Sequence, residues 1–247
     1  MALFEARNLH MRFGDRTVLE NVSLAFEAGG LHGIMGPNGA GKTTCFNVLT
    51  GRYKPTRGQV IVDGEEITGL APHLIARKGV SRSFQIMNLF NDFTARENVM
   101  AALPAMRERG FDAWHAVDTN TGLADEAEAV LRRVGLGGKG DVIAKSLSYG
   151  DRRALEIGVA LGARPRIVFL DEPTSGLGSD GTARLFDLIQ SLKGQLTIVA
   201  IEHDMPFLFG LADEISVIHW GQVIARGTPD ALRDNEWVRR SNLGKLQ

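Results

Sequence analysis

The chain has a single cysteine, Cys45, among its 247 residues. One thiol cannot form a disulfide within the chain, so the fold must be held by its core and its hydrogen bonds. Long apolar runs are also missing: LTIVAI and MPFLFGLA fall far short of the roughly 18 residues that a membrane-spanning helix needs. The N-terminal MALFEARNLH lacks the basic segment and long apolar run of a signal peptide. We therefore expect a cytoplasmic protein that reaches a membrane only through a partner.

An excess of either charge is absent as well. The formal net charge is -1, whereas a protein built mainly to bind nucleic acid usually presents a strongly basic face. We therefore expect no nucleic acid partner. Internal repeats, low-complexity tracts and Ser/Pro linkers are also lacking, which disfavours a tandem array. Hydrophobic residues make up 44% of the chain, as in ordinary globular proteins, and we treat residues 1–247 as one composite domain.

Hydrophobic patterning predicts an α/β fold. Residues 3–10 and 18–27 alternate apolar and polar side chains, as half-buried strands do. Residues 59–67 are typical of a hairpin with an Asp-Gly turn, and a second hairpin is expected around Trp220-Gly221. The short apolar runs RIVFLDE and LTIVAIEHD are separated by a helical segment, residues 182–192, which predicts a parallel sheet with crossovers.

The middle of the chain has a different pattern. From about residue 94 to residue 163 the spacing of apolar side chains is mainly helical, with helices expected at 100–109 and 125–134. Residues 110–123 are the least patterned part. We therefore expect a helical subdomain over about residues 86–163, beside an antiparallel β part near the N-terminus.

The strongest motif is GPNGAGKTT, which follows a predicted strand and opens a predicted helix. It matches G-x-x-x-x-G-K-[ST], the phosphate-binding P-loop, whose glycines let backbone N–H groups wrap phosphates. Lys42 can reach the β- and γ-phosphates, and the Thr43 hydroxyl can coordinate Mg²⁺. The expected nucleotide-binding residues of this loop are Gly36, Pro37, Asn38, Gly39, Ala40, Gly41, Lys42, Thr43 and Thr44. The fold is therefore expected to be an α/β P-loop core, with ATP and Mg²⁺ as ligands.

Two acids end the apolar run RIVFLDE. A buried strand would deliver Asp171 to the metal, normally through water, and Glu172 to the water that attacks the phosphate. An acidic pair after a strand could instead cap a helix. After a phosphate loop, the catalytic interpretation is the stronger one.

A third motif, LSYGD, precedes the helical run RRALEIGVAL. Ser148 stands where a helix-capping serine would stand. The functional alternative is that this helix N-terminus, with Ser148 and Gly150, points at a γ-phosphate. Its distance from the phosphate loop is puzzling within one chain, but in a head-to-tail dimer it would complete the partner's site.

The three motifs, in this order and spacing, resemble the ATP-binding-cassette (ABC) family over essentially the whole chain. The resemblance implies roles for three further residues. Gln85 matches the glutamine loop that joins the metal to a transmembrane partner, and His203 matches the switch histidine at the γ-phosphate. Phe13 matches the aromatic that stacks on adenine, although it could be an ordinary core phenylalanine. Implied partners are integral membrane permease subunits and a second ABC ATPase subunit, identical or related, at the inner face of the cell membrane.

The sequence departs from the family pattern at two places. LSYGD carries Tyr149 and Asp151 where the family's LSGGQ has Gly and Gln, while Ser148 and Gly150 are kept. In DEPTSGLGSD, Gly178 stands where the family usually has an aspartate that helps link the two sites of the dimer. This loss bears on coupling between the sites more than on ATP binding.

IEHDM and SRSFQIMNLF followed by TARENV resemble the ATPase subunits of branched-chain amino acid importers, and urea importers share these features. FQIMNLF would then line the groove where a transmembrane helix docks, or it could be local core. The function implied is ATP hydrolysis that powers such an importer. Two alternatives remain at this point: a soluble cassette ATPase, for example in iron–sulfur assembly, and a regulatory nucleotide binder that does not hydrolyse.

Overall fold

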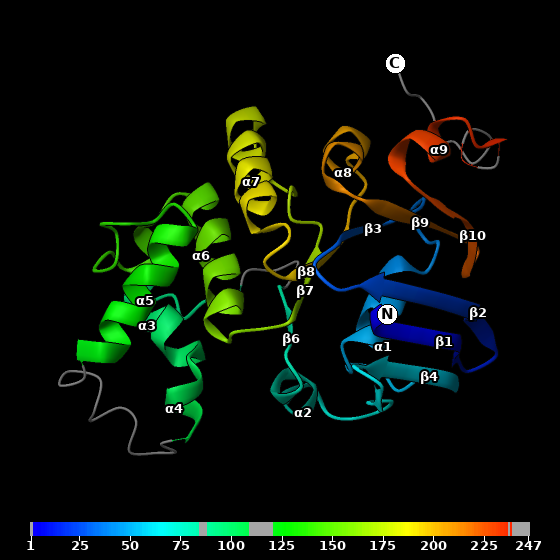
Figure 1. The fold of residues 1–247 in the computed structure, drawn as a ribbon, viewed down its shortest axis with the longest axis horizontal. Coiled ribbons are helices and arrows are strands. Elements are labelled where there is room, and N and C mark those ends of the chain that lie inside the picture. The colour runs from blue at the N-terminus through cyan, green and yellow to red at the C-terminus, as the bar shows by residue number, and fades with distance from the viewer. Residues whose placement is uncertain (1, 84–87, 109–120, 237, 239–247) are drawn as a thin grey trace.

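The computed structural model describes residues 2–83, 88–108, 121–236 and 238. Its strands form two sheets (Figure 1). The antiparallel sheet has the order β2-β1-β4-β5 and consists of β1 (Ala2–Phe13), β2 (Arg16–Glu27), β4 (Arg57–Val62) and β5 (Glu65–Glu66). The second sheet has the order β10-β9-β3-β8-β7-β6 and consists of β3 (Leu31–Met35), β6 (Val80–Arg82), β7 (Ile167–Asp171), β8 (Thr197–Ile201), β9 (Glu214–His219) and β10 (Gln222–Gly227).

The second sheet is the parallel core that the two apolar runs predict. Strands β9, β3, β8, β7 and β6 pair in parallel, and β10 closes one edge in antiparallel register with β9. Every residue of β7 is buried, as expected for a parallel strand covered on both faces. Ile167 and Phe169 pack on the side of the antiparallel sheet, whereas Val168 and Leu170 pack against helices on the other side.

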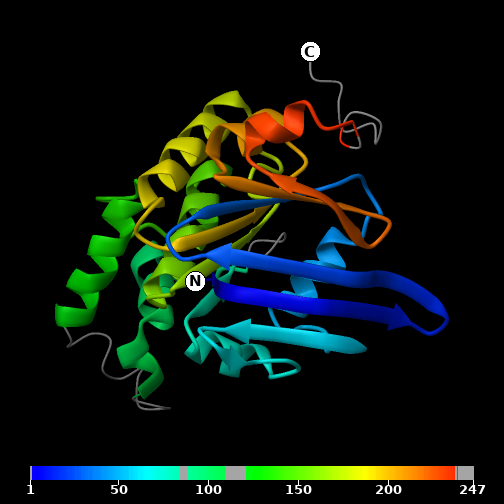
Figure 2. The same ribbon diagram turned by 45° about the vertical axis from the view of Figure 1, so that its right-hand side comes forward.

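The helices of the described residues are α1 (Lys42–Leu49), α2 (Pro72–Arg77), α3 (Ala95–Ala102), α4 (Pro104–Glu108), α5 (Thr121–Arg133), α6 (Tyr149–Gly162), α7 (Ser179–Leu192), α8 (Met205–Leu211) and α9 (Pro229–Arg233). Figure 2 shows the antiparallel sheet along one face of the six-stranded sheet and α7 and α8 against the other. Side chains of α1, including the fully buried Cys45 and Phe46, pack in the core that the two sheets share. Helix α1, which follows the phosphate loop, is therefore held by side chains of both sheets.

Helices α3, α5 and α6 pack on one another at the end of the molecule away from the antiparallel sheet (Figure 1). Thr94 and Glu97 form a capping box that starts α3, since each side chain accepts a hydrogen bond from the other residue's backbone N–H. Ser148 starts α6 in a similar way, its Oγ accepting from the Asp151 N–H.

Two predictions of secondary structure need correction, and one strand was missed. The helix expected at 100–109 is interrupted: α3 ends at Ala102, Leu103 is extended, and Pro104 opens α4. Steric conflict with the proline ring keeps Leu103 out of the helical region. The helix expected at 182–192 begins earlier, at Ser179. Strand β6 was not predicted, because three residues are too short to show a periodicity.

Within the described ranges, none of the helices has the length and apolar character that crossing a bilayer requires.

Candidate nucleotide-binding site

The phosphate loop runs from the end of β3 to the start of α1. A Cβ at Gly36 would lie 2.0 Å from the Ile218 carbonyl oxygen, so the close approach of two backbones there requires glycine. Gly41 has a left-handed backbone with φ 100° and offers α1 no side-chain cap. The first turn of a helix has N–H groups without partners in the helix, and these are therefore aimed at the space in front of the loop.

Lys42 lies at the floor of this loop and is only 7% exposed. Its Nζ donates to the carbonyl oxygens of Gly36 at 2.7 Å and Pro37 at 3.0 Å. Burial lowers the pKa of Lys42, and the nearby carboxylates of Glu172 and Asp171 act in the opposite direction. The ammonium group is thus held inside the loop by neutral oxygens that an anionic phosphate could replace.

A cavity of about 310 Å³ opens in front of the loop. It is lined by Arg16, Val18, Asn38, Gly39, Gly41, Lys42, Thr43, Thr44 and Glu172. The structure therefore brings Glu172 to the phosphate loop, across more than a hundred residues of sequence. Arg16 and Val18 on β2 were missed by sequence reasoning, which had no motif to mark them.

Phe13 does not line this cavity, but it pairs with Arg16 in the register of β1 and β2. The Phe13 side chain is 46% exposed, and its ring meets Tyr53 edge-on at 5.4 Å between centroids. An ordinary core phenylalanine would be buried. Phe13 therefore leaves an aromatic surface open beside the cavity.

Asp171 and Glu172 follow each other at the end of β7 but have different surroundings. Asp171 is 4% exposed, and burial raises its pKa while the Arg82 guanidinium acts in the opposite direction. Glu172 has a left-handed backbone with φ 45°, which is uncommon for a residue with a Cβ. Its N–H donates to the Ile201 carbonyl at 2.9 Å. This turn swings the Glu172 side chain out to the cavity while Asp171 stays inside.

His203 follows β8 and lies next to Glu172. The distance from His203 Nδ1 to Glu172 Oε1 is 3.9 Å, and the histidine side chain is 61% exposed. The preceding residue, Glu202, is almost fully buried and fixes this loop. Its carboxylate accepts from the N–H of His203 at 3.1 Å and from the N–H and hydroxyl of Thr174 at 2.8 and 2.7 Å. Sequence reasoning missed Glu202, although IEHDM places this acid directly before the predicted switch histidine.

Ser148 and Gly150 do not line the cavity at the phosphate loop. Ser148 is exposed and caps its own helix. The two unusual signature residues have contacts of their own: the Tyr149 hydroxyl donates to the Ser175 carbonyl at 2.9 Å, and Asp151 forms an ion pair with Lys139 at 2.7 Å. Burial alone would raise the pKa of Asp151, but hydrogen bonds from Lys139 and Ser148 outweigh it, so this pKa is lowered.

Gly178 is the N-cap of α7, with an extended backbone at φ -80° and ψ 177°. An added Cβ there would meet no atom within 4 Å. Neither the conformation nor the space at this position requires glycine, so the missing aspartate is not a consequence of the fold. Asp180, the next acid, lies in the first turn of α7.

Gln85 lies outside the described residues, as do Phe84, Ile86 and Met87 of the FQIMNLF segment. The residues that lead to it are anchored to the site. The Ser83 hydroxyl accepts from the Asp171 N–H at 3.4 Å. Arg82 donates to Asn47 Oδ1 and Thr50 Oγ1, at 3.1 and 2.9 Å, and its guanidinium lies 4.6 Å from the centre of the Phe46 ring. Burial lowers the pKa of Arg82, with Asp171 opposing.

A phosphate cradle that opens onto a carboxylate and a histidine has the composition of a nucleoside triphosphate hydrolase. The profile of the ABC transporter family matches residues 19–175, which is more than half of the chain. The chain belongs to the ABC transporter family, and it is an ATP-binding-cassette ATPase. The resemblance drawn from the three motifs is thus confirmed, as is the P-loop α/β fold.

Known members of the family are similar to this chain over nearly its whole length. BraF of Pseudomonas aeruginosa, a high-affinity branched-chain amino acid transport ATP-binding protein, is 41% identical, covering 98% of this chain and 98% of BraF. LivG of Escherichia coli carries the same description and is 38% identical, with 98% of each chain covered. The crystal structure of the ADP conformation of MJ1267, an ATP-binding cassette of an ABC transporter, is similar with a TM-score of 0.86 at 26% identity, covering 99% of this chain and all of MJ1267.

Proposed function

We propose that this chain is the ATP-hydrolysing subunit that powers an importer of branched-chain amino acids. The observation that carries the proposal is the identity of 38–41% to BraF and LivG over 98% of the chain. An ATPase of this class does not contact the transported molecule, so the nearness of these relatives, and not the site, supports the choice of substrate.

For nucleotide binding, the proposal assigns the phosphates to the N–H groups of the phosphate loop and of the first turn of α1. Lys42 would exchange its bonds to the Gly36 and Pro37 carbonyls for bonds to the β- and γ-phosphates. The open ring of Phe13 would stack on the adenine, with Arg16 and Val18 at the cavity wall.

The residues present also fit a magnesium ion. Mg²⁺ keeps several waters and is usually held by one or two protein groups plus substrate phosphates. Within the described ranges no cluster of three acidic, histidine or cysteine side chains forms a complete metal cage, which is compatible with that mode. Thr43, Asp171 and Gln85 would hold the ion, the last from outside the described residues. When bound, the ion would neutralise charge that develops on the phosphates.

For hydrolysis, Glu172 is the proposed general base. Its carboxylate lines the cavity and can accept the proton of the attacking water. His203, 3.9 Å away, would contact the γ-phosphate and hold the water and the carboxylate in line. The buried carboxylate of Glu202 binds both Thr174 and the His203 N–H, so it holds the His203 loop beside the segment that follows Glu172.

A second cassette, identical or related, is part of the proposal. Ser148 and Gly150 are too far from the cavity of their own chain to line it, yet Ser148 is exposed at the N-terminus of the long helix α6. In a head-to-tail dimer this helix end would close the partner's site over the γ-phosphate.

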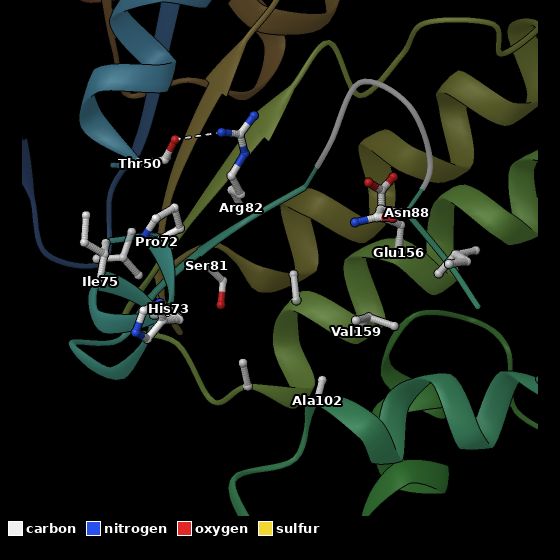
Figure 3. Close-up of a pocket in the computed structure, with 15 residues that line it drawn as sticks. Thr50, Pro72, His73, Ile75, Ser81, Arg82, Asn88, Ala102, Glu156 and Val159 are labelled. Carbon is white, nitrogen blue, oxygen red and sulfur yellow. Dashed lines mark hydrogen bonds between the residues drawn. The ribbon is translucent and has the colours of Figure 1, made fainter. Parts of the chain in front are cut away.

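Permease subunits are the proposed membrane partner, with this chain peripheral at the inner face of the membrane. A groove of about 340 Å³ lies between the core and the proposed helical subdomain, residues 86–163 (Figure 3). His73 and Ile75 of α2 line one side, and Val159 of α6 and Ala102 of α3 line the other. The groove reaches Asn88 and Leu89 of the FQIMNLF segment, and Phe90, the last residue of that segment, is 57% exposed. Its lining is mostly apolar, which suits side chains of a short permease helix.

Purification of the native complex from its source tests the proposal. We expect the chain to co-purify with integral membrane subunits and a second cassette, and its deletion to abolish uptake of labelled leucine while uptake of urea is unaffected. Recovery of a homodimer on an exporter, or of a chain without membrane partner, would contradict the transport role but not the ATPase assignment. If the deletion abolished urea uptake and not leucine uptake, the chain would instead be assigned to a urea importer.

A further inference from the structure

Two charged side chains face the groove from opposite walls: Arg82 at the end of β6, and Glu156 on α6 (Figure 3). Glu156 is only 5% exposed. One of its carboxylate oxygens, Oε2, accepts from Nη1 of Arg153, one turn earlier on the same helix, at 2.5 Å. Arg153 is 3% exposed, so both charges of this pair are buried.

Arg153 reaches from Glu156 to the end of β7. Its Nη2 donates to the carbonyl oxygens of Asp171 at 3.0 Å and Glu172 at 2.9 Å, and its Nε donates to the Pro173 carbonyl at 3.1 Å. These three consecutive carbonyls bracket the left-handed turn that aims Glu172 at the cavity. The guanidinium therefore fixes the backbone of the proposed general base.

A buried ion pair is not a simple way to stabilise a helix, because removing two charges from water is expensive and apolar residues of similar size often stabilise as well. Here the ion pair connects the groove with the backbone turn at Glu172. One end lines the groove, and the other end holds the catalytic turn. The planar fork of arginine makes this possible, since one guanidinium can bond a carboxylate and several carbonyls in fixed directions.

We propose that Glu156 and Arg153 are positioning residues that transmit the presence of the permease in the groove to the backbone of Glu172. The inference rests on the proposed function, because the groove has to be the permease site. A helix that enters the groove shifts α6 or its Glu156 carboxylate, Arg153 follows, and the turn at Glu172 changes its aim. Helix α6 also carries Ser148, so the same displacement moves the surface that meets the second cassette.

The test compares ATP hydrolysis by the cassettes alone with hydrolysis by the reconstituted complex of cassettes and permease, for the wild type and for Glu156→Gln. The readouts are kcat, KM for ATP and the stimulation ratio, which is kcat with permease divided by kcat without. We expect Glu156→Gln to lower the stimulation ratio about tenfold, as loss of a charge-assisted hydrogen bond would, with KM within about twofold of the wild type. Glu156→Asp, which keeps the charge on a shorter side chain, should recover part of the ratio.

Glu126→Gln is the matched control. Glu126 lies on α5 and pairs with Arg164 at 2.6 Å on the surface of the same helical region, away from the groove lining and the cavity. It should keep the wild-type ratio. If Glu156→Gln does not fold, Arg153→Lys takes its place, since lysine keeps the charge but cannot reach three carbonyls and Glu156 together; the ratio should again fall.

The outcomes separate the two proposals. A wild type that the permease does not stimulate overturns the proposed function and this inference with it. A stimulated wild type together with an unchanged ratio in a folded Glu156→Gln or Arg153→Lys variant overturns the inference alone. An equal fall of the ratio in Glu126→Gln would also overturn it, because any lost ion pair in this region would then suffice.

Discussion

The two regions that we propose to act on the nucleotide, the phosphate loop and the signature segment at Ser148, are built differently. The phosphate loop is tightly packed: Lys42 is buried, and Gly36 permits a close contact of two backbones. A defined cavity opens in front of the loop. The signature end at Ser148 is an exposed helix start whose hydroxyl is used within its own helix. The first region is a buried loop with a cavity of its own, whereas the second is an exposed helix end that our proposal assigns to the site of a second cassette.

This difference has a physical basis. The phosphate loop gains its geometry from covalent neighbours and from β3 and α1, which pack in the core of the two sheets. The signature helix is placed by packing on α3 and α5 and by the contacts of Arg153 to the end of β7. Changes at the first region should therefore act on binding or chemistry in each chain, and changes at the second should act through assembly.

The largest effect is expected for Glu172→Gln, which removes the proposed general base but keeps a hydrogen-bonding side chain. Phosphate release should fall about 100-fold or more, since general base catalysis contributes factors of that size. Nucleotide titration of the same variant is the control and should give near wild-type affinity. Hydrolysis close to the wild-type rate would show that the base lies elsewhere, and the phosphate-loop end would no longer be chemically complete. His203→Ala should slow turnover in the same direction with little effect on binding.

Next in size is Lys42→Ala. A hydrogen bond to a charged group contributes about 1.5–3 kcal/mol, so ATP affinity should fall at least about tenfold. Isothermal titration of the folded variant measures this directly. An unchanged affinity would contradict the role of Lys42 and would weaken the contrast between the two ends.

The third expectation concerns assembly. With ATP and Mg²⁺, Glu172→Gln should accumulate a dimer in light scattering, whereas the wild type alone should be mostly monomeric. Adding Ser148→Ala to Glu172→Gln should weaken that dimer. Loss of a helix cap itself costs about 1 kcal/mol, so Thr228→Ala, which removes the hydroxyl that caps α9, serves as the matched control and should leave the dimer intact. An ATP-dependent dimer that forms equally well without the Ser148 hydroxyl would separate the signature end from the shared site.

Gly178→Asp should have the smallest effect. The position is an N-cap with extended backbone and free space, so aspartate should fit and stabilise α7 by a few tenths of a kcal/mol relative to glycine. ATP affinity should not change. The dependence of the hydrolysis rate on a second cassette should change. The melting temperature and the rate as a function of cassette concentration are the measurements. A large loss of ATP affinity would show that the loop containing Gly178 contributes to the nucleotide-binding cavity at the phosphate loop.

The sequence predicts the residues of the phosphate loop, but it does not predict the hydrogen bonds that join distant elements. The loop, Asp171 and Glu172 are contiguous motifs that follow predicted strands, so their positions could be predicted from local pattern. Arg153 and Glu202 act on carbonyls and N–H groups far away in the chain, and nothing local marks those partners. The break at Pro104 was predictable from proline chemistry, whereas β6 is a three-residue strand that is recognised only by its pairing with β7.

One feature of α1 has a practical consequence. Burial raises the pKa of the Cys45 thiol to about 12, and the side chain is fully enclosed in the shared core. Thiol reagents react with the thiolate, so this cysteine should be silent to maleimide dyes and spin labels in the folded protein. A cysteine introduced on the surface would then be the sole labelled position without removal of the native residue. Pairs of such labels on α5 and β2 would report the movement between the helical region and the core by fluorescence transfer.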